Sequence, residues 1–315
     1  MIVSKINQST SNPSFAWVTL CTTRSYLPGI LVLARSLRQC QSRYPLVVMV
    51  THDLLIDEAA SALTQEPNIR QRLVSSIQPS PQAHTEYAYA TFSEVWTKLR
   101  CWELVEFAKL VFLDADMLVL RNMDHLFEIE LAVPSDEFVF SNSTLPTEIR
   151  SNLPFLAAVD ACVCNPLGRP NYPSWWVPEN CRHSHVTSGI TPLANPGYFN
   201  SGLFVFHPNV AMANDMVNKI QTASENLSRY LFPDQDFLND YFKSQWLRLP
   251  YVYNAMKTMK VAHPDLWNLQ NIHNLHYIIN KPWNIDIKTT SINEEQFYDL
   301  YEIWWDFSEG ATRAP

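Results

Sequence analysis

KLVFLDADMLVL, at residues 109–120, carries the strongest structural signal of this 315-residue chain. Its apolar run from Leu110 to Leu113 predicts a short buried strand that ends in two carboxylates, Asp114 and Asp116. Carboxylates at such a position need a cationic partner. In an open α/β sheet, ligands bind beyond the carboxyl ends of the strands, where an i, i+2 acidic pair can hold Mg²⁺ or Mn²⁺ together with substrate phosphates. The stretch therefore predicts a divalent metal between the protein and a diphosphate.

Strand and helix patterns alternate around this stretch in the first half of the chain, which is typical of an α/β fold with a parallel sheet. Strands are predicted at residues 15–21, 45–51 and 70–77, and helices at residues 27–40, 54–63 and 93–107.

The second half is interrupted by a long stretch, residues 143–195, that is rich in proline and has no clear period. Loops of this length inside a compact domain are usually lids or binding loops. Its adjacent Trp175 and Trp176 could stack on a ligand or lie in a core. Around it, strands are predicted at 138–142, 198–206, 249–254 and 274–279, and helices at 209–224 and 235–242.

Charge and composition indicate which classes of partner and which cellular location to expect. The net charge is −8, and lysine and arginine do not cluster, so we expect no nucleic-acid partner. No window approaches the roughly 18 apolar residues of a membrane span, and the polar N-terminus lacks a signal-peptide core. We therefore expect a cytoplasmic protein without a membrane span, whose six cysteines are reduced thiols.

Several polar residues flank the predicted strands. Lys98 could meet a phosphate or sugar, or it could be a solvated lysine on an amphipathic helix. Asn200 and Ser201 begin a strand and could face a ligand. Asp234 lies just before a predicted helix, where it could bind a ligand or cap the helix. His276 is a further candidate ligand for the metal of the acidic pair.

A second group of candidate ligands lies in the long stretch. Cys162 and Cys164 are followed by Cys181, His183 and His185, all of which can bind a soft metal. Their spacing matches no standard zinc motif. The favoured interpretation is a set of buried, reduced cysteines, with a zinc site as the alternative.

Seven blocks together resemble glycosyltransferase family 8, which includes glycogenin and galactinol synthase. They occur in the family's order between Phe15 and about Trp283. The blocks are WVTLCTTRSYLPG at 17–29, TKLRCW at 97–102, FLDADMLVL at 112–120, YFNSGLFVF at 198–206, DQDFLN at 234–239, LPYVYN at 249–254 and LHYIINKPW at 275–283.

The resemblance implies a GT-A fold: a Rossmann-like mixed sheet with helices on both faces and an acceptor-binding half. It implies one domain at residues 1–285, with an acceptor lid at 143–195 and a helical tail at 286–315. The implied cofactors are Mn²⁺ (or Mg²⁺) and a UDP-sugar donor, with UDP-glucose or UDP-galactose favoured. The implied reaction retains anomeric configuration and transfers a hexose to a hydroxyl of a small molecule or glycan.

The resemblance also implies roles for single residues. The metal ligands would be Asp114, Asp116 and His276, and Lys281 would meet the diphosphate. The nucleoside would be held by Leu20, Thr22, Thr23 and Tyr26, with Asp114 and the backbone of Ala115. The donor sugar and reaction centre would be surrounded by Lys98, Asp160, Asn200, Ser201, Asp234 and Gln235.

The sequence departs from glycogenin at two places. The segment from His276 to Lys281 is one residue shorter than in glycogenin and holds Ile279 where the family has a glycine whose amide meets the diphosphate. His263 stands where glycogenin carries its self-glucosylated tyrosine, so self-glucosylation is not expected. The pair His263-Pro264, the Cys162-Val-Cys164 sequence and DQDFLN at 234–239 are more similar to galactinol synthase and related fungal members.

Other interpretations remain open from sequence alone. Asp160 or Asp234 could be a nucleophile, but we favour front-face attack with both aspartates orienting sugar hydroxyls. A haloacid-dehalogenase-type phosphatase shares the Asp-x-Asp motif, although Leu118 does not fit its pattern, and a non-catalytic sugar-nucleotide or carbohydrate-binding protein could keep the fold. The apolar tail at 294–307 could dock on its own domain or form a homodimer.

Overall fold

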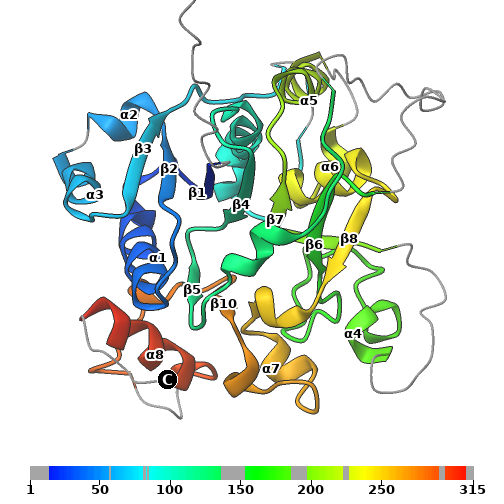
Figure 1. The fold of residues 1–315 in the computed structure, drawn as a ribbon. Helices are drawn as coiled ribbons and strands as arrows, with labels where there is room; N and C mark the ends of the chain where they lie inside the picture. Colours follow the sequence, from blue (N-terminus) through cyan, green and yellow to red (C-terminus); the bar gives the residue numbers. More distant parts are fainter. Residues whose placement is uncertain are drawn as a thin grey trace, which may run out of the picture.

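A mixed sheet of seven strands forms the centre of the protein in the computed structural model (Figure 1). The structure describes residues 14–56, 58–80, 83, 85–135, 153–185, 197–222, 227–290 and 295–309. The strand order is β3-β2-β1-β4-β7-β6-β8, and β7 runs antiparallel to both of its neighbours. The strands are β1 (Phe15–Cys21), β2 (Leu46–Val50), β3 (Ile69–Leu73), β4 (Lys109–Leu113), β6 (Leu156–Asp160), β7 (Phe199–Phe206) and β8 (Trp246–Leu249).

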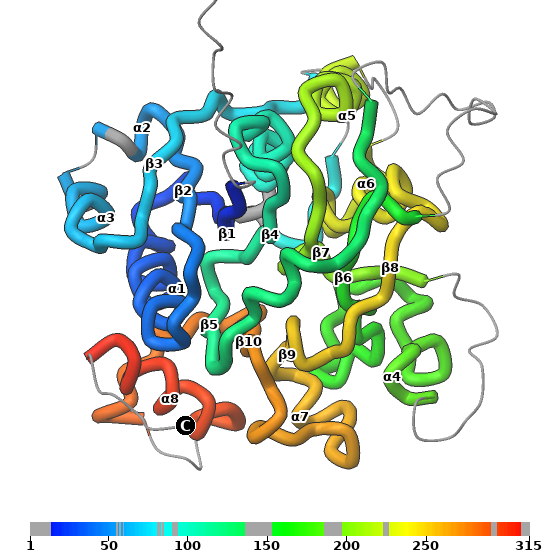
Figure 2. Tube along the Cα trace, viewed as in Figure 1, coloured from blue at the N-terminus to red at the C-terminus, as the bar shows by residue number. Residues whose placement is uncertain are grey.

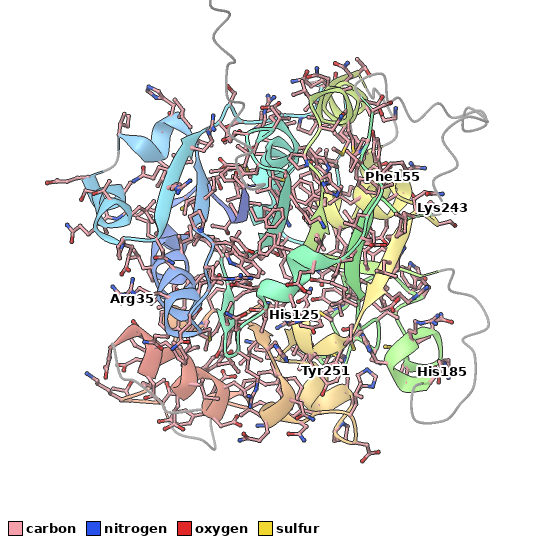
Figure 3. All side chains as sticks on the ribbon, in the orientation of Figure 1. Arg35, His125, Phe155, His185, Lys243 and Tyr251 are labelled. Carbon is pink, nitrogen blue, oxygen red and sulfur yellow. The ribbon has the colours of Figure 1, made fainter. Side chains whose placement is uncertain are left out.

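Both faces of the sheet are covered, because successive side chains of a strand point to opposite faces. On β4, Leu110 and Phe112 join one apolar core, and Val111 and Leu113 join the other. One core includes residues of α1 (Leu27–Gln39), and the opposite core includes residues of α5 (Val210–Thr222) and α6 (Pro233–Tyr241). The side chains fill the space between these layers (Figure 3). The predicted mixed sheet with helices on both faces is confirmed.

A second, three-stranded sheet carries part of the site. It consists of β5 (Met117–Val119), β10 (Asn274–His276) and β9 (Ala255–Met256), in the order β5-β10-β9 (Figure 2). β10 pairs antiparallel to β5 with His276 opposite Met117. This register places His276 beside Asp116, although the two residues are far apart in sequence.

The structure corrects several predicted elements. The stretch at 143–195 is not irregular throughout, because β6 lies in it and completes the main sheet. Residues 90–103 form a long 3₁₀ segment, η3 (Ala90–Glu103), rather than an α-helix. The strand predicted at 249–254 ends at Leu249 and is followed by a 3₁₀ turn, Tyr251–Tyr253. The strand predicted at 138–142 lies outside the described residues.

The helix predicted at 54–63 is also interrupted. It divides into α2 (His52–Leu55), a 3₁₀ segment (Glu58–Ser61) and α3 (Ala62–Gln65). Two further short helices are α4 (Arg182–His185) and α7 (Met259–Ala262).

The C-terminal helix α8 (Tyr298–Ser308) packs on its own domain, beside α1 (Figures 1 and 2). Trp304 is buried in an apolar cluster with Val32 of α1, and Arg35 donates a hydrogen bond to the carbonyl of Ser308 at 2.9 Å. Docking within the chain therefore accounts for the apolar face of the tail. Within the described part of the chain, no helix combines the length and the apolar character needed to cross a membrane.

Candidate active site

A cavity of about 630 Å³ lies where the carboxyl ends of β1 and β4 meet the second sheet. Its volume falls in the range of small-molecule sites. Most of the predicted site residues line it together: Leu20, Thr22, Tyr26, Lys98, Asp114, Ala115, Asp116, Asn200, Ser201, Asp234, Gln235, His276 and Lys281.

Two predicted residues lie outside this lining. Thr23 is exposed, and its hydroxyl lies 2.9 Å from that of Ser25. Asp160, at the end of β6, is buried and pairs with Arg248 at 3.3 Å and with Arg182 at 3.7 Å. The structure thus does not bring the Asp160 carboxylate into the cavity, and its catalytic role stays a prediction.

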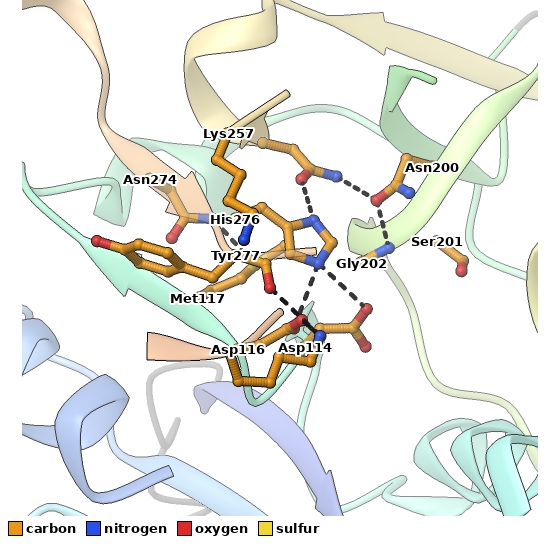
Figure 4. Close-up of polar contacts among 12 residues, drawn as sticks. Asp114, Asp116, Met117, Asn200, Ser201, Gly202, Lys257, Asn274, His276 and Tyr277 are labelled. Atoms are coloured by element: carbon orange, nitrogen blue, oxygen red, sulfur yellow. Dashed lines mark hydrogen bonds and ion pairs between the residues drawn. The ribbon is translucent and has the colours of Figure 1, made fainter. Parts of the chain in front are cut away.

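Asp114, Asp116 and His276 meet at one point of the cavity (Figure 4). The Nε2 atom of His276 lies 3.3 Å from an oxygen of Asp116 and 3.8 Å from an oxygen of Asp114. One ligand atom from each of the three residues fits within 4.8 Å. Two carboxylates and an imidazole suit Mn²⁺ or Mg²⁺, so this donor set fits the metal that the motif predicts.

The imidazole is held in one orientation by its neighbours. The amide oxygen of Asn254 lies 2.8 Å from Nδ1 of His276, so Nδ1 carries the proton and Nε2 is left to bind a metal. Asn254 in turn donates to the amide oxygen of Asn200 at 2.8 Å. Gly202 makes room for the ring, since a Cβ there would lie 2.5 Å from Cε1 of His276.

Lys281 contributes a positive charge beside the acidic pair. Its ammonium group donates to Asp116 and, at 3.3 Å, to the carbonyl of Tyr277. Burial acts to lower the pKa of Lys281, but the charge and hydrogen bond of Asp116, together with Tyr26 and Asp114, outweigh it and the pKa is raised. Burial likewise acts to raise the pKa of Asp116, but Lys281 and His276 outweigh it, and this pKa lies far below its ordinary value. Both groups are therefore charged at neutral pH.

Lys98 connects the acidic pair to the other side of the cavity. Its ammonium group lies 3.0 Å from Asp114 and 2.5 Å from Asp234, and it also donates to the carbonyl of Ser201. Burial acts to lower the pKa of Lys98, yet the two carboxylates outweigh it and the pKa is raised. Lys98 is thus a buried, charged residue and not a solvated lysine on an amphipathic surface.

The start of β7 and the N-terminus of α6 form one hydrogen-bonded network. The hydroxyl of Ser201 donates to Asp234 at 2.8 Å. The side-chain oxygen of Gln235 accepts from the amide of Asn200 at 2.8 Å, and its NH₂ group donates to Tyr198 at 2.8 Å. Asp234 makes no hydrogen bond that caps α6, so the capping interpretation is not supported.

Ile279 shows how the departure from glycogenin is accommodated. Its φ angle is +68°, a left-handed conformation that glycine adopts freely and that a β-branched residue adopts only at a cost of about 1–3 kcal/mol. Ile279 also lines the cavity. The structure therefore holds a β-branched residue here in a backbone conformation that is typical of glycine.

The sequence analysis missed other residues of the cavity. Arg169, Tyr172 and Phe232 line it together with Trp176, which the sequence analysis gave as a residue that could stack on a ligand. Trp176 stacks on Phe232 with ring centroids 4.8 Å apart, and Tyr172 meets both rings edge-on. Only the adjacent tryptophans gave a sequence signal. Asn254 lies in the block LPYVYN at 249–254, but nothing in the sequence indicated its hydrogen bond to His276.

The comparisons with known proteins agree with this geometry. The model of the family "Glycosyl transferase family 8" matches residues 17–286. Galactinol synthase 2 of Arabidopsis thaliana is 30% identical over 309 residues, which cover 96% of this chain and 83% of the relative. Galactinol synthase 1 of Solanum lycopersicum is 31% identical, covering 98% of this chain and 86% of the relative.

Solved structures of low identity share the fold. The galactosyltransferase LgtC, crystallised with donor and acceptor sugar analogs, is 17% identical with a TM-score of 0.54, and the match covers 95% of this chain and 97% of LgtC. The glycosyltransferase GlyE of Streptococcus pneumoniae is 18% identical with a TM-score of 0.55, and the match covers 94% of this chain and 60% of that longer chain. The fold, the residues that meet in the cavity and the match over most of the sequence agree: the chain belongs to glycosyl transferase family 8.

Proposed function

We propose that this protein transfers galactose from UDP-galactose to a hydroxyl of a small polyhydroxylated acceptor, with Mn²⁺ at Asp114, Asp116 and His276. As a member of family 8 the protein is a UDP-sugar-dependent, retaining glycosyltransferase. The galactinol synthase relatives favour galactose as the sugar and a small molecule as the acceptor. This membership also sets aside the phosphatase alternative.

The single observation that carries the proposal is the meeting of Asp114, Asp116, His276 and Lys281 at one wall of the cavity. Cleavage of the bond between the anomeric carbon and UDP leaves negative charge on the β-phosphate. A metal bound by the three ligands would stabilise that charge as it develops. Lys281, held charged by Asp116, is placed to add a second positive charge.

The residues around the donor sugar support front-face attack. Asp234 is buried, and its Oδ2 atom both pairs with Lys98 and accepts a hydrogen bond from Ser201. Asp160 does not line the cavity. Asp160 is thus not presented to the donor, and Asp234 is held by its ion pair with Lys98. A route in which the acceptor hydroxyl loses its proton toward the departing phosphate needs neither aspartate. In this proposal Asp234 and Gln235 orient sugar hydroxyls.

The acceptor would bind against the aromatic wall of Tyr172, Trp176 and Phe232. Aromatic faces suit the C–H faces of a ring-shaped polyol, while the acidic pair and Lys281 lie at the donor end. We extend the proposal to the chain organisation: residues 1–285 act as one catalytic domain, segment 143–195 selects the acceptor, and the tail at 286–315 supports the domain through α8.

Turnover of UDP-sugars with and without Mn²⁺ tests the proposal. We expect slow, metal-dependent hydrolysis of UDP-galactose without acceptor, faster turnover when a small polyol is added, and less turnover with UDP-glucose, UDP-xylose and UDP-N-acetylglucosamine. Lys281→Met should lower kcat by about 10²–10³-fold, the usual cost of removing one preorganised charge-stabilising group. Binding of UDP-sugars with no turnover under any of these conditions would favour the non-catalytic binding protein and reject the transferase.

A further inference from the structure

Three thiols and one imidazole meet at a second point, away from the acidic pair. Cys162 and Cys164 follow β6, Cys181 directly precedes α4, and His263 directly follows α7. All four are buried, and the cysteines form no disulfide. α4 and α7 lie at the same end of the molecule (Figures 1 and 2). The cluster therefore joins three segments that are separated in sequence.

The distances in the cluster match those around one tetrahedral ion. Nε2 of His263 lies 3.3 Å from the sulfur of Cys162, 3.4 Å from that of Cys164 and 3.5 Å from that of Cys181. All four ligand atoms lie within 4.8 Å of one another. A tetrahedral zinc ion with usual Zn–S and Zn–N bond lengths places sulfur and nitrogen about 3.5 Å apart. The side chains are thus already arranged for one ion.

We propose that Cys162, Cys164, Cys181 and His263 bind a structural zinc ion. Three thiolates and an imidazole are a soft donor set that selects zinc over Mn²⁺ or Mg²⁺. Four protein ligands leave no open position, which is the mark of a structural site rather than a catalytic one. A two-iron cluster would spread its ligands over two metal atoms, whereas here all three sulfurs surround one nitrogen.

The neighbours of the cluster support this assignment. The hydroxyl of Ser184 lies 3.6 Å from the sulfur of Cys164, where it can donate a hydrogen bond to a thiolate. His183 is not among the four grouped residues, and its Nε2 lies 2.9 Å from the carbonyl oxygen of Asp160. His185, labelled at the edge of the molecule in Figure 3, bonds to the carbonyl of Glu179. The histidine ligand is therefore His263, far away in sequence.

The zinc ion would hold the wall of the active-site cavity. Cys162 itself lines the cavity, and the chain between Cys164 and Cys181 supplies Arg169, Tyr172 and Trp176 to its lining. This chain contains no regular element longer than a single 3₁₀ turn, so few backbone hydrogen bonds fix its shape. A metal that clamps both of its ends onto α7 would replace that missing support.

Metal analysis of the protein purified under reducing conditions without chelator tests the inference. We expect about one zinc ion per chain, which resists dialysis against EDTA at a concentration that removes Mn²⁺. Cys181→Ser should lower the zinc content by about 10-fold or more, because a structural site loses most of its affinity with one ligand. Cys101→Ser, a similarly buried cysteine of the main core, is the matched control and should keep its zinc.

Cobalt substitution gives a readout that needs no variant. Wild-type protein reconstituted with Co²⁺ should show the visible bands of tetrahedral cobalt and a thiolate charge-transfer band, both absent in Cys181→Ser if that variant folds. Wild-type protein that carries far less than one zinc and binds neither Zn²⁺ nor Co²⁺ tetrahedrally would overturn the proposal. Iron in place of zinc would overturn it as well. None of these readouts depends on transferase activity.

Discussion

The acidic cluster of Asp114, Asp116 and His276 and the thiol cluster of Cys162, Cys164, Cys181 and His263 differ in ligand type and in access to solvent. The Asp114 side chain is 29% exposed and faces the cavity, whereas Cys181 is fully buried. A metal at the acidic cluster can therefore exchange ligands with a substrate. A metal at the thiol cluster would be enclosed by protein. Access to solvent thus separates a centre suited to catalysis from one suited to structure.

The two clusters also differ in what balances their charge. Lys98 and Lys281 already neutralise the acidic pair, so those carboxylates are satisfied in the absence of metal. The thiol cluster has its closest contacts among its own members, with His263 in contact with each sulfur. Loss of metal should therefore abolish function at the first cluster and loosen the structure at the second.

Asp116→Asn is the change expected to separate the two clusters most sharply. It keeps the shape of the side chain but removes a metal ligand and the partner of Lys281. Since a metal that stabilises a departing phosphate contributes several kcal/mol, kcat/KM should fall by about 10³-fold or more. Mn²⁺-dependent binding of UDP, measured by calorimetry, should be lost.

The zinc content of the same variant is its internal control. It should equal that of the wild type, and the circular dichroism spectrum should be unchanged, because the thiol cluster shares no ligand with the acidic pair. Undiminished Mn²⁺-dependent UDP binding would remove Asp116 from the metal site.

Asn254→Ala tests a residue that orients the ligand His276 and is not itself a ligand of the acidic cluster. Asn254 is fully buried and accepts the Nδ1 proton of His276 at 2.8 Å. Without it the imidazole can rotate or change tautomer, so the dissociation constant for Mn²⁺ should rise about 10–100-fold. Activity should recover at high Mn²⁺, which distinguishes a positioning residue from a ligand. Activity that stays low at saturating Mn²⁺ would contradict this role.

Much of the donor side was predictable from sequence because its residues lie where strands end. The apolar run before Asp114 indicates a buried strand, and polar residues that follow such strands meet at one edge of the sheet. Asn200 and Ser201 were predicted instead as the polar start of a strand, and the structure brings them to the cavity because β7 runs antiparallel to β4. Local pattern indicated these residues, and the resemblance to family 8 supplied the other residues of the donor side.

The remainder could not be predicted because it depends on contacts between distant segments. β6 was missed because its short apolar run, Leu156–Asp160, is surrounded by proline-rich sequence. His263 was interpreted only as the replacement for a tyrosine, and nothing local connects it to Cys162. Asn254 and His276 meet only because β9 and β10 pair in the small sheet.

Trp176→Leu should have the smallest effect and tests whether the segment next to the thiol cluster selects the acceptor. Trp176 is 9% exposed, lines the cavity and stacks on Phe232, and leucine keeps an apolar side chain but loses the ring face. Transfer to a small polyol should fall about 2–10-fold, the value of one aromatic contact, while hydrolysis of the donor without acceptor stays within about 2-fold. Trp175→Leu is the matched control, because Trp175 is 39% exposed and does not line the cavity. If Trp176→Leu lowered hydrolysis and transfer equally, this wall would support the whole site and would not select the acceptor.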